Sequence, residues 1–187
     1  TNCYNTGTIT GTGTRSQDAY YGGICGSSGT QTNCYNTGAV SGRSSYGGIC
    51  GNYGTQTNCY YLEGCCSRSG GGVSVTAEEF ASGKIGYLLN GNNNNAWYQD
   101  LYSDEYPLLD NTHNLVSGYI EVADDTYTVV GDMFLAANYE IAAGKTLNAP
   151  AGTSLTTTGN AVITNNGTII CNGTLAGNNL AGNGTFI

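Results

Sequence analysis

The chain has 187 residues, of which 30 are glycine and two are proline, and its formal net charge is −8. The acidic balance argues against nucleic acid as a partner, because phosphate binding needs clustered Lys and Arg and only five basic residues are present. No apolar run approaches the roughly 18–20 residues of a membrane span, so no membrane-spanning segment is expected in this sequence.

The first part of the chain repeats itself with a period of 25 residues. Tyr21–Thr37 reads YGGICGSSGTQTNCYNT, and Tyr46–Glu63 reads YGGICGNYGTQTNCYYLE. The chain opens on TNCYNTG at Thr1–Gly7, the tail of an earlier copy, and extra residues fall only in the polar segment Gly11–Ala19. A fixed period with a confined insertion predicts one structural unit per repeat. Because the chain begins inside a repeat, we expect it to be a piece of a longer protein.

Each copy holds three short runs with β-branched or aromatic residues, separated by glycine-containing corners. Such short runs are too short for helices and suit strands. We therefore predict an all-β fold, a right-handed β-helix (β-solenoid) with coils of about 25 residues that stabilise one another by stacking. Equivalent residues of successive coils should form ladders, and the predicted structural ladder consists of Cys3, Cys34 and Cys59, of Cys25 and Cys50, and of Ile24 and Ile49.

The run TQTNCY at Thr30–Tyr35 predicts a strand with two different faces. Side chains alternate along a strand, so Cys34 should share one side with the threonines. Tyr35 should lie on the other side with Gln31 and Asn33.

Eight cysteines leave two interpretations open. Zinc is not expected, because the chain has no C-x-x-C pair and only one His. Disulfides within or between coils are one alternative for an extracellular protein. We favour the other, in which repeat cysteines act as small buried hydrophobes in ladders.

The segment GGICG followed by TQTNCYNTGAVSG resembles the GLUG-motif repeat of bacterial cell-surface proteins and adhesins. Gly22–Gly26 and Gly47–Gly51 match its glycine-rich core, with Cys25 and Cys50 where Val is commoner. The resemblance covers about the first 70 residues. It implies an extracellular, repetitive β-rich protein of the clostridial type, from gut Firmicutes. Such motifs are specific for architecture and weak for ligand.

After a flexible break at Ser67–Gly72, the period changes. Thr76 and Glu79 form a capping box, and an apolar face follows that includes Phe80. These features predict one helix over about 77–89, ended by Asn90-Gly91. We expect residues 1–72 to form the GLUG-like solenoid and residues 73–112 to form a helix-containing cap or junction.

The block from the helix to Leu109 also resembles a segment that follows such arrays in clostridial surface proteins and closes them. Trp97 and Tyr98 are then core residues of the cap. The functional alternative is an aromatic platform for sugar rings. Its candidate ligand-binding residues are Trp97, Tyr98, Tyr35 and Tyr60.

Residues 113–187 are expected to form a second β-rich solenoid segment, which resembles β-solenoid segments of the same surface proteins. Asp124-Asp125 is the predicted turn of a hairpin. Apolar residues that follow glycine-containing corners predict an inward ladder. Its members are Leu147, Leu155, Ile163, Ile169, Leu175, Leu180 and Phe186.

The sequence offers no catalytic motif. β-Helix glycosidases use paired carboxylates, whereas the thirteen acids cluster in the middle of the chain, where acids in turns are usually solvated. Asp104-Glu105 and Asp124-Asp125 lack a calcium loop. We therefore predict no catalytic residue, no metal ligand and no cofactor.

The predicted function is that of a non-catalytic extracellular protein of the bacterial cell surface, for adhesion or structural display. Its expected partners are a host glycan, a matrix protein or a second copy bound end to end. The alternatives are a carbohydrate-active β-helix enzyme, a lyase or hydrolase, and a purely self-assembling fibre subunit.

Overall fold

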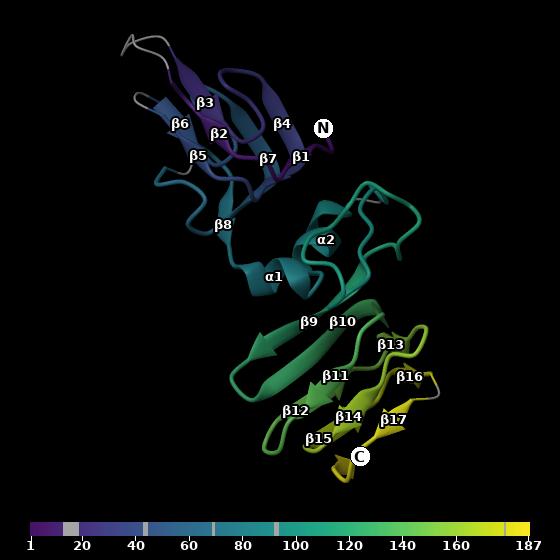
Figure 1. Ribbon diagram of the computed structural model, residues 1–187. Coiled ribbons are helices and arrows are strands. Elements are labelled where there is room, and N and C mark those ends of the chain that lie inside the picture. The colour runs from purple at the N-terminus through teal and green to yellow at the C-terminus, as the bar shows by residue number, and fades with distance from the viewer. Residues whose placement is uncertain (13–18, 43–44, 69, 92–93, 178) are drawn as a thin grey trace. The chain divides into compact units, whose positions relative to one another are not determined.

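The computed structural model describes residues 1–12, 19–42, 45–68, 70–91, 94–177 and 179–187. Strands make up about 45% of the chain, and most of them stack in parallel from coil to coil in a β-solenoid fold, as predicted. The chain divides into two compact units, Thr1–Ala77 and Glu78–Ile187, whose elements are labelled in Figure 1. Most of the segment expected to form a cap therefore belongs to the second unit. Most of the insertion at Gly11–Ala19 lies outside the described residues.

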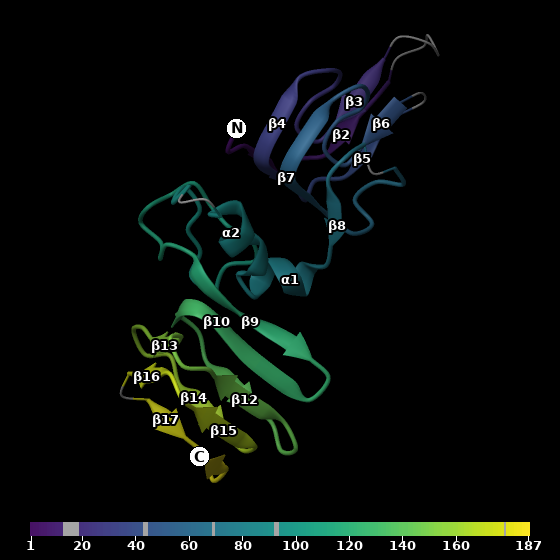
Figure 2. The same ribbon diagram turned by 180° about the vertical axis from the view of Figure 1, so that it is seen from behind.

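The first unit has three faces of parallel strands, which Figures 1 and 2 show from opposite sides. One face contains β1, β4, β7 and β8 in that order, and the pairs β2–β5 and β3–β6 form the other two. The register places identical residues of the two repeats opposite each other, such as Thr30 opposite Thr55 and Tyr35 opposite Tyr60. The strands are β1 (Tyr4–Asn5), β2 (Ile9–Thr10), β3 (Tyr20–Gly22), β4 (Thr30–Asn36), β5 (Val40–Ser41), β6 (Ser45–Gly47), β7 (Thr55–Leu62) and β8 (Val73–Val75).

The repeat cysteines lie in register between coils. Cys34 pairs with Cys59 and Cys25 with Cys50, and the Tyr35 N–H donates to the carbonyl of Cys3. All eight cysteines carry free thiols. Neighbouring strands lie about 4.8 Å apart, whereas a disulfide needs Cβ atoms about 3.8 Å apart. The in-register stacking therefore favours thiols over cross-links.

The long strands of the first face bend at an asparagine. Asn33 and Asn58 have left-handed φ values of 53° and 52°, a conformation that Asn tolerates better than most residues. The bend interrupts the alternation of side chains, so Gln31, Cys34 and Tyr35 are all buried. The prediction of two faces separated by simple alternation is therefore wrong here.

Side-chain amides reinforce this bend by stacking from coil to coil. The Asn58 Nδ2 donates to Asn33 Oδ1 over 2.8 Å, and the Gln56 Nε2 donates to Gln31 Oε1 over 2.8 Å. These buried and half-buried amides thus find their partners in the equivalent amides of the neighbouring coil, which meets the hydrogen-bonding requirement of polar groups inside a protein.

The predicted single helix is two short helices, α1 (Ala77–Ala81) and α2 (Lys84–Leu89). Gly83 separates them with a left-handed φ of 85°, which a continuous helix does not allow. A Cβ atom at Gly83 would lie 2.5 Å from Cδ2 of Leu101, so the glycine lets Leu101 pack close to the break. The predicted end of the helix at Asn90 is confirmed.

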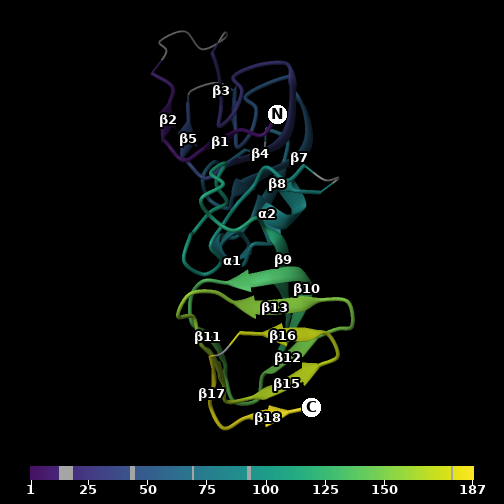
Figure 3. The ribbon, with the colours of Figure 1, turned by 90° about the vertical axis from the view of Figure 1, so that its right-hand side faces the viewer.

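The second solenoid begins with an antiparallel hairpin, β9 (Ser117–Ala123) and β10 (Thr126–Leu135), whose turn is Asp124–Asp125 as predicted. The first half of β10 pairs with β12 and its second half with β13, so β10 contributes to two faces. Parallel strands then stack coil on coil, as Figure 3 shows. They are β11 (Tyr139–Ile141), β12 (Thr146–Ala149), β13 (Ser154–Thr157), β14 (Ile163–Asn165), β15 (Thr168–Cys171), β16 (Thr174–Ala176), β17 (Leu180–Ala181) and β18 (Thr185–Phe186).

The predicted inward ladder of the second unit is present. Leu147 is opposite Ile169, which is opposite Phe186 in the next coil. Leu147 and Ile169 are buried with Leu155 and Ile163 in one core. In the last coil, Leu180 and Phe186 are about half exposed, because no further coil covers them among the described residues.

Replacing Leu147 by Ala should lower the free energy of unfolding of the second unit by about 2–5 kcal/mol, since the side chain is fully buried. Denaturant titration, monitored by the fluorescence of Trp97, the single tryptophan, measures this loss of unfolding free energy. Leu180→Ala is the matched control, because its side chain is 51% exposed. An equal loss in both variants would contradict the core described above.

The thiol ladders predict that all eight cysteines react with a thiol reagent in denaturant without reductant. In the native protein, Cys34 and Cys59 should be protected, because they are buried, while exposed Cys3 reacts quickly. Mass spectrometry of the labelled peptides distinguishes the sites. Fewer reactive thiols in denaturant would show disulfides instead.

Candidate ligand-binding groove

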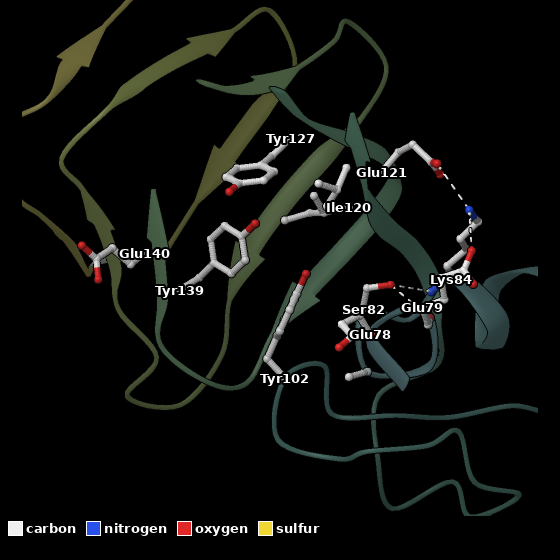
Figure 4. Close-up of a pocket in the computed structure, with 12 residues that line it drawn as sticks. Glu78, Glu79, Ser82, Lys84, Tyr102, Ile120, Glu121, Tyr127, Tyr139 and Glu140 are labelled. Carbon is white, nitrogen blue, oxygen red and sulfur yellow. Dashed lines mark hydrogen bonds and ion pairs between the residues drawn. The ribbon is translucent and has the colours of Figure 1, made fainter. Parts of the chain in front are cut away.

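The second unit contains a groove of about 610 Å³. Residues of α1, α2, β9, β10 and β11 line it, together with Tyr102 from the loop after α2. Three tyrosines, Tyr102, Tyr127 and Tyr139, are among the lining residues, and Figure 4 shows their rings close to one another. We call these three residues the tyrosine cluster.

The rings of the tyrosine cluster meet at an angle instead of lying flat. The ring centroids of Tyr102 and Tyr139 are 5.2 Å apart with an interplanar angle of 57°, and those of Tyr127 and Tyr139 are 6.4 Å apart at 78°. The pair of Tyr127 and Tyr139 has the edge-to-face arrangement that aromatic pairs prefer, and the pair of Tyr102 and Tyr139 is tilted. The cluster also packs on the apolar interior of the solenoid. It therefore forms the walls of a pocket and not a flat platform.

Burial favours the neutral hydroxyls of Tyr102 and Tyr139. It raises the pKa of Tyr102 to about 12, and burial also raises the pKa of Tyr139. Tyr102 and Tyr139 share a hydrogen bond as well. At neutral pH the groove thus offers phenol groups that donate or accept hydrogen bonds.

Tyr102 has a left-handed φ of 64°, which is unusual for a bulky residue. A tight turn holds it there: the N–H groups of Ser103 and Asp104 both donate to the carbonyl of Asp100. On its other side, Leu101 bridges to Leu135 at the end of β10. Held between these two constraints, Tyr102 places its ring beside Tyr139.

A network of ion pairs borders the groove on the side of the helices. The Lys84 Nζ lies 3.1 Å from Glu79 Oε1 and 3.3 Å from Glu121 Oε1, as the dashed lines in Figure 4 show. The hydrogen bond with Glu79 is the main reason why the pKa of Lys84 is raised. Glu78 on α1 adds a further carboxylate. Glutamates therefore outnumber the single lysine here.

The residues proposed from sequence lie elsewhere. Trp97 and Tyr35 are fully buried, so neither presents a ring face to a ligand, which contradicts the alternative of an aromatic platform at these two residues. Tyr98 is half-buried and pairs with Leu108 through its backbone. The half-buried Tyr60 donates its hydroxyl proton to Asn58. Tyr35 and Tyr60 belong to the first unit and the other two to the second.

Trp97 is a core residue of the second unit. Asn90 fixes its backbone, because Oδ1 accepts the N–H of Trp97 and Nδ2 donates to its carbonyl. Sequence reasoning missed the tyrosine cluster because its members are far apart along the chain. Tyr102 was expected only as a core residue of the cap, and Tyr127 only as a residue of the predicted hairpin.

Asp100, Asp104 and His113 bring three potential ligand atoms within 4.8 Å of one another. The carboxylates already have partners in the loop. Asp100 Oδ1 accepts hydrogen bonds from the backbone and side-chain N–H groups of Asn114, and Asp104 Oδ2 accepts the N–H of Asp100. We assign this cluster the structural role of closing the loop that carries Tyr102.

Raising the pH should reveal the burial of Tyr102. Its folded pKa lies above the usual value, so it contributes stability that is fully present below pH 10 and is lost as the pH rises toward about 12. The absorbance of tyrosinate should contain a component that titrates near pH 12 and disappears in Tyr102→Phe. Tyr53→Phe is the control, because Tyr53 is 84% exposed and its loss should leave that component unchanged. A late component that survives Tyr102→Phe would contradict the assignment.

Comparisons with models of protein families, with curated proteins and with solved structures found no match. The resemblance of the repeats to the GLUG motif therefore stays a prediction that depends on the residues quoted above. None of the described helices is long and apolar enough to cross a membrane.

Proposed function

We propose that the chain is a non-catalytic adhesive protein of the bacterial cell surface that holds its ligand in the groove beside the tyrosine cluster. The observation that carries this proposal is the make-up of the groove: a concave, mostly apolar site with a few hydroxyls and charges. Binding sites generally have this composition. The stacked coils supply a rigid support, and the GLUG-like repeats agree with an extracellular location.

The charges at the groove suit binding better than proton transfer. A glycosidase needs two carboxylates whose pKa values are pushed apart. Here one ammonium group, that of Lys84, lies between Glu79 and Glu121 and forms an ion pair with each. The raised pKa of Lys84 keeps it a cation, so it does not act as a base or nucleophile at neutral pH.

The tyrosine cluster should determine affinity. We expect the purified chain to bind at least one member of a panel of glycans and matrix proteins saturably, without releasing reducing ends. Tyr127→Ala should weaken that binding at least tenfold, because it removes one wall of the pocket. Trp97 fluorescence checks that the variant is folded. Tyr53→Ala, at an exposed tyrosine of the first unit, is the matched control and should bind normally.

The same binding assay distinguishes the competing functions. Release of reducing ends would contradict adhesion and would show that the chain is a carbohydrate-active enzyme. Filaments in electron micrographs, with no binding to the panel, would contradict adhesion and would show that the chain is a self-assembling fibre subunit. Equal weakening by Tyr127→Ala and Tyr53→Ala would place the ligand outside the groove.

A further inference from the structure

The groove beside the tyrosine cluster carries more negative than positive charge. Four glutamates line it, and Lys84 is the only basic residue among the described residues there. Lys84 pairs with Glu79 and Glu121. Glu78 and Glu140 take part in no ion pair within the described chain. The groove therefore keeps an excess of negative charge beyond its ion pairs, which attracts cations and repels anions.

The aromatic part of the groove is within reach of a ligand. Each member of the tyrosine cluster lines the groove and is partly exposed. Tyr139 belongs to both ring pairs, with its centroid 5.2 Å from that of Tyr102 and 6.4 Å from that of Tyr127, and Figure 4 shows the three rings together. A cation is attracted to an aromatic ring whose centroid lies within about 6 Å. A single cation here can therefore be in range of Tyr139 and of a second ring at the same time.

The walls of the groove favour a cation that donates no hydrogen bonds. A primary ammonium group carries three N–H donors and is strongly hydrated, and losing that hydration against apolar walls is costly. The hydroxyls of Tyr102 and Tyr139 already share a hydrogen bond. A quaternary ammonium group has no N–H donor, and its methyl groups are compatible with an apolar surface. Aromatic rings recognise cations of this kind.

We propose that the groove binds a quaternary ammonium group, the charged group of choline, against the rings of the tyrosine cluster. The rings attract the cation at short range, and the carboxylates of Glu78 and Glu140 favour its approach. Phosphatidylcholine and surfaces decorated with phosphocholine both present this group. The inference rests on the proposed function, because it names the ligand class of the same groove.

The probe is choline chloride, titrated into the full chain and followed by NMR spectroscopy. We expect saturable binding, with nuclear Overhauser effects between the choline methyl protons and the ring protons of Tyr139. Neohexyl alcohol is the matched control ligand, because it replaces the charged nitrogen of choline by carbon and keeps the shape. It should bind about tenfold more weakly, since a desolvated contact between a cation and a ring contributes about that factor. Equal binding of the two ligands would overturn cation recognition.

Substitutions at Tyr139 test whether the ring itself provides the affinity. Tyr139→Leu keeps an apolar side chain but removes the ring, and it should weaken choline binding about tenfold. Tyr139→Phe keeps the ring and is the matched control, with near-normal affinity expected. Equal affinity of the two variants would overturn the role of the ring. Trp97 fluorescence verifies that both variants are folded, and the comparison with neohexyl alcohol decides the question without any variant if Tyr139→Leu does not fold.

A second assay separates the two sources of the group. Cosedimentation with phosphatidylcholine vesicles, but not with phosphatidylglycerol vesicles, would support the inference and assign the ligand to a membrane surface. Binding to a conjugate of phosphocholine and albumin, without binding to the vesicles, would support it and assign the ligand to a decorated macromolecule. No binding to vesicles, to the conjugate or to free choline would overturn it.

The outcomes also distinguish this inference from the proposed function. Choline binding without contacts to the ring protons of Tyr139 would overturn the site. Binding of a glycan or matrix protein that is lost in Tyr127→Ala, while choline does not bind, would overturn the quaternary ammonium as ligand and leave adhesion standing. If neither choline nor any glycan or matrix protein binds, both proposals fail.

Discussion

The structure depends on one constraint: each coil must place its residues in register above those of the coil before it. A coil is too small to bury its own apolar side chains, so its stability comes from the neighbouring coils. In the first unit the constraint aligns like with like, thiol on thiol and amide on amide. In the second it aligns aliphatic side chains, such as Leu147 with Ile169. The same buried contacts and hydrogen bonds thus recur between successive coils.

The fold could be predicted from the sequence where this constraint produces a repeat or a recognisable turn in the sequence. The period of 25 residues predicted the solenoid, and Asp124-Asp125 predicted the hairpin. Local backbone conformation was not predictable in the same way. The left-handed Asn33 interrupts the alternation of its strand, and the left-handed Gly83 divides the expected helix. Both residues adopt conformations that tertiary packing selects and that propensity alone does not reveal.

The groove could not be predicted, because it arises from topology. Tyr102, Tyr127 and Tyr139 come from a loop and two strands, and only the winding of the chain brings them together. The alternative of a sugar-binding platform at Trp97 and Tyr35 fails for the opposite reason: large aromatic residues stabilise interiors as well as binding sites, and here both are buried. Sequence composition alone does not separate these two uses of an aromatic ring.

The hairpin of β9 and β10 also has a consequence for how the second unit folds. It is closed by a turn of two residues, whereas the parallel pairings of β10 join residues about twenty positions apart, as in Thr126 with Thr146. Closing the short loop costs less chain entropy, and local contacts form faster than distant ones. We therefore expect the hairpin to form before the parallel pairings, after which the long strand β10 can pair with both β12 and β13.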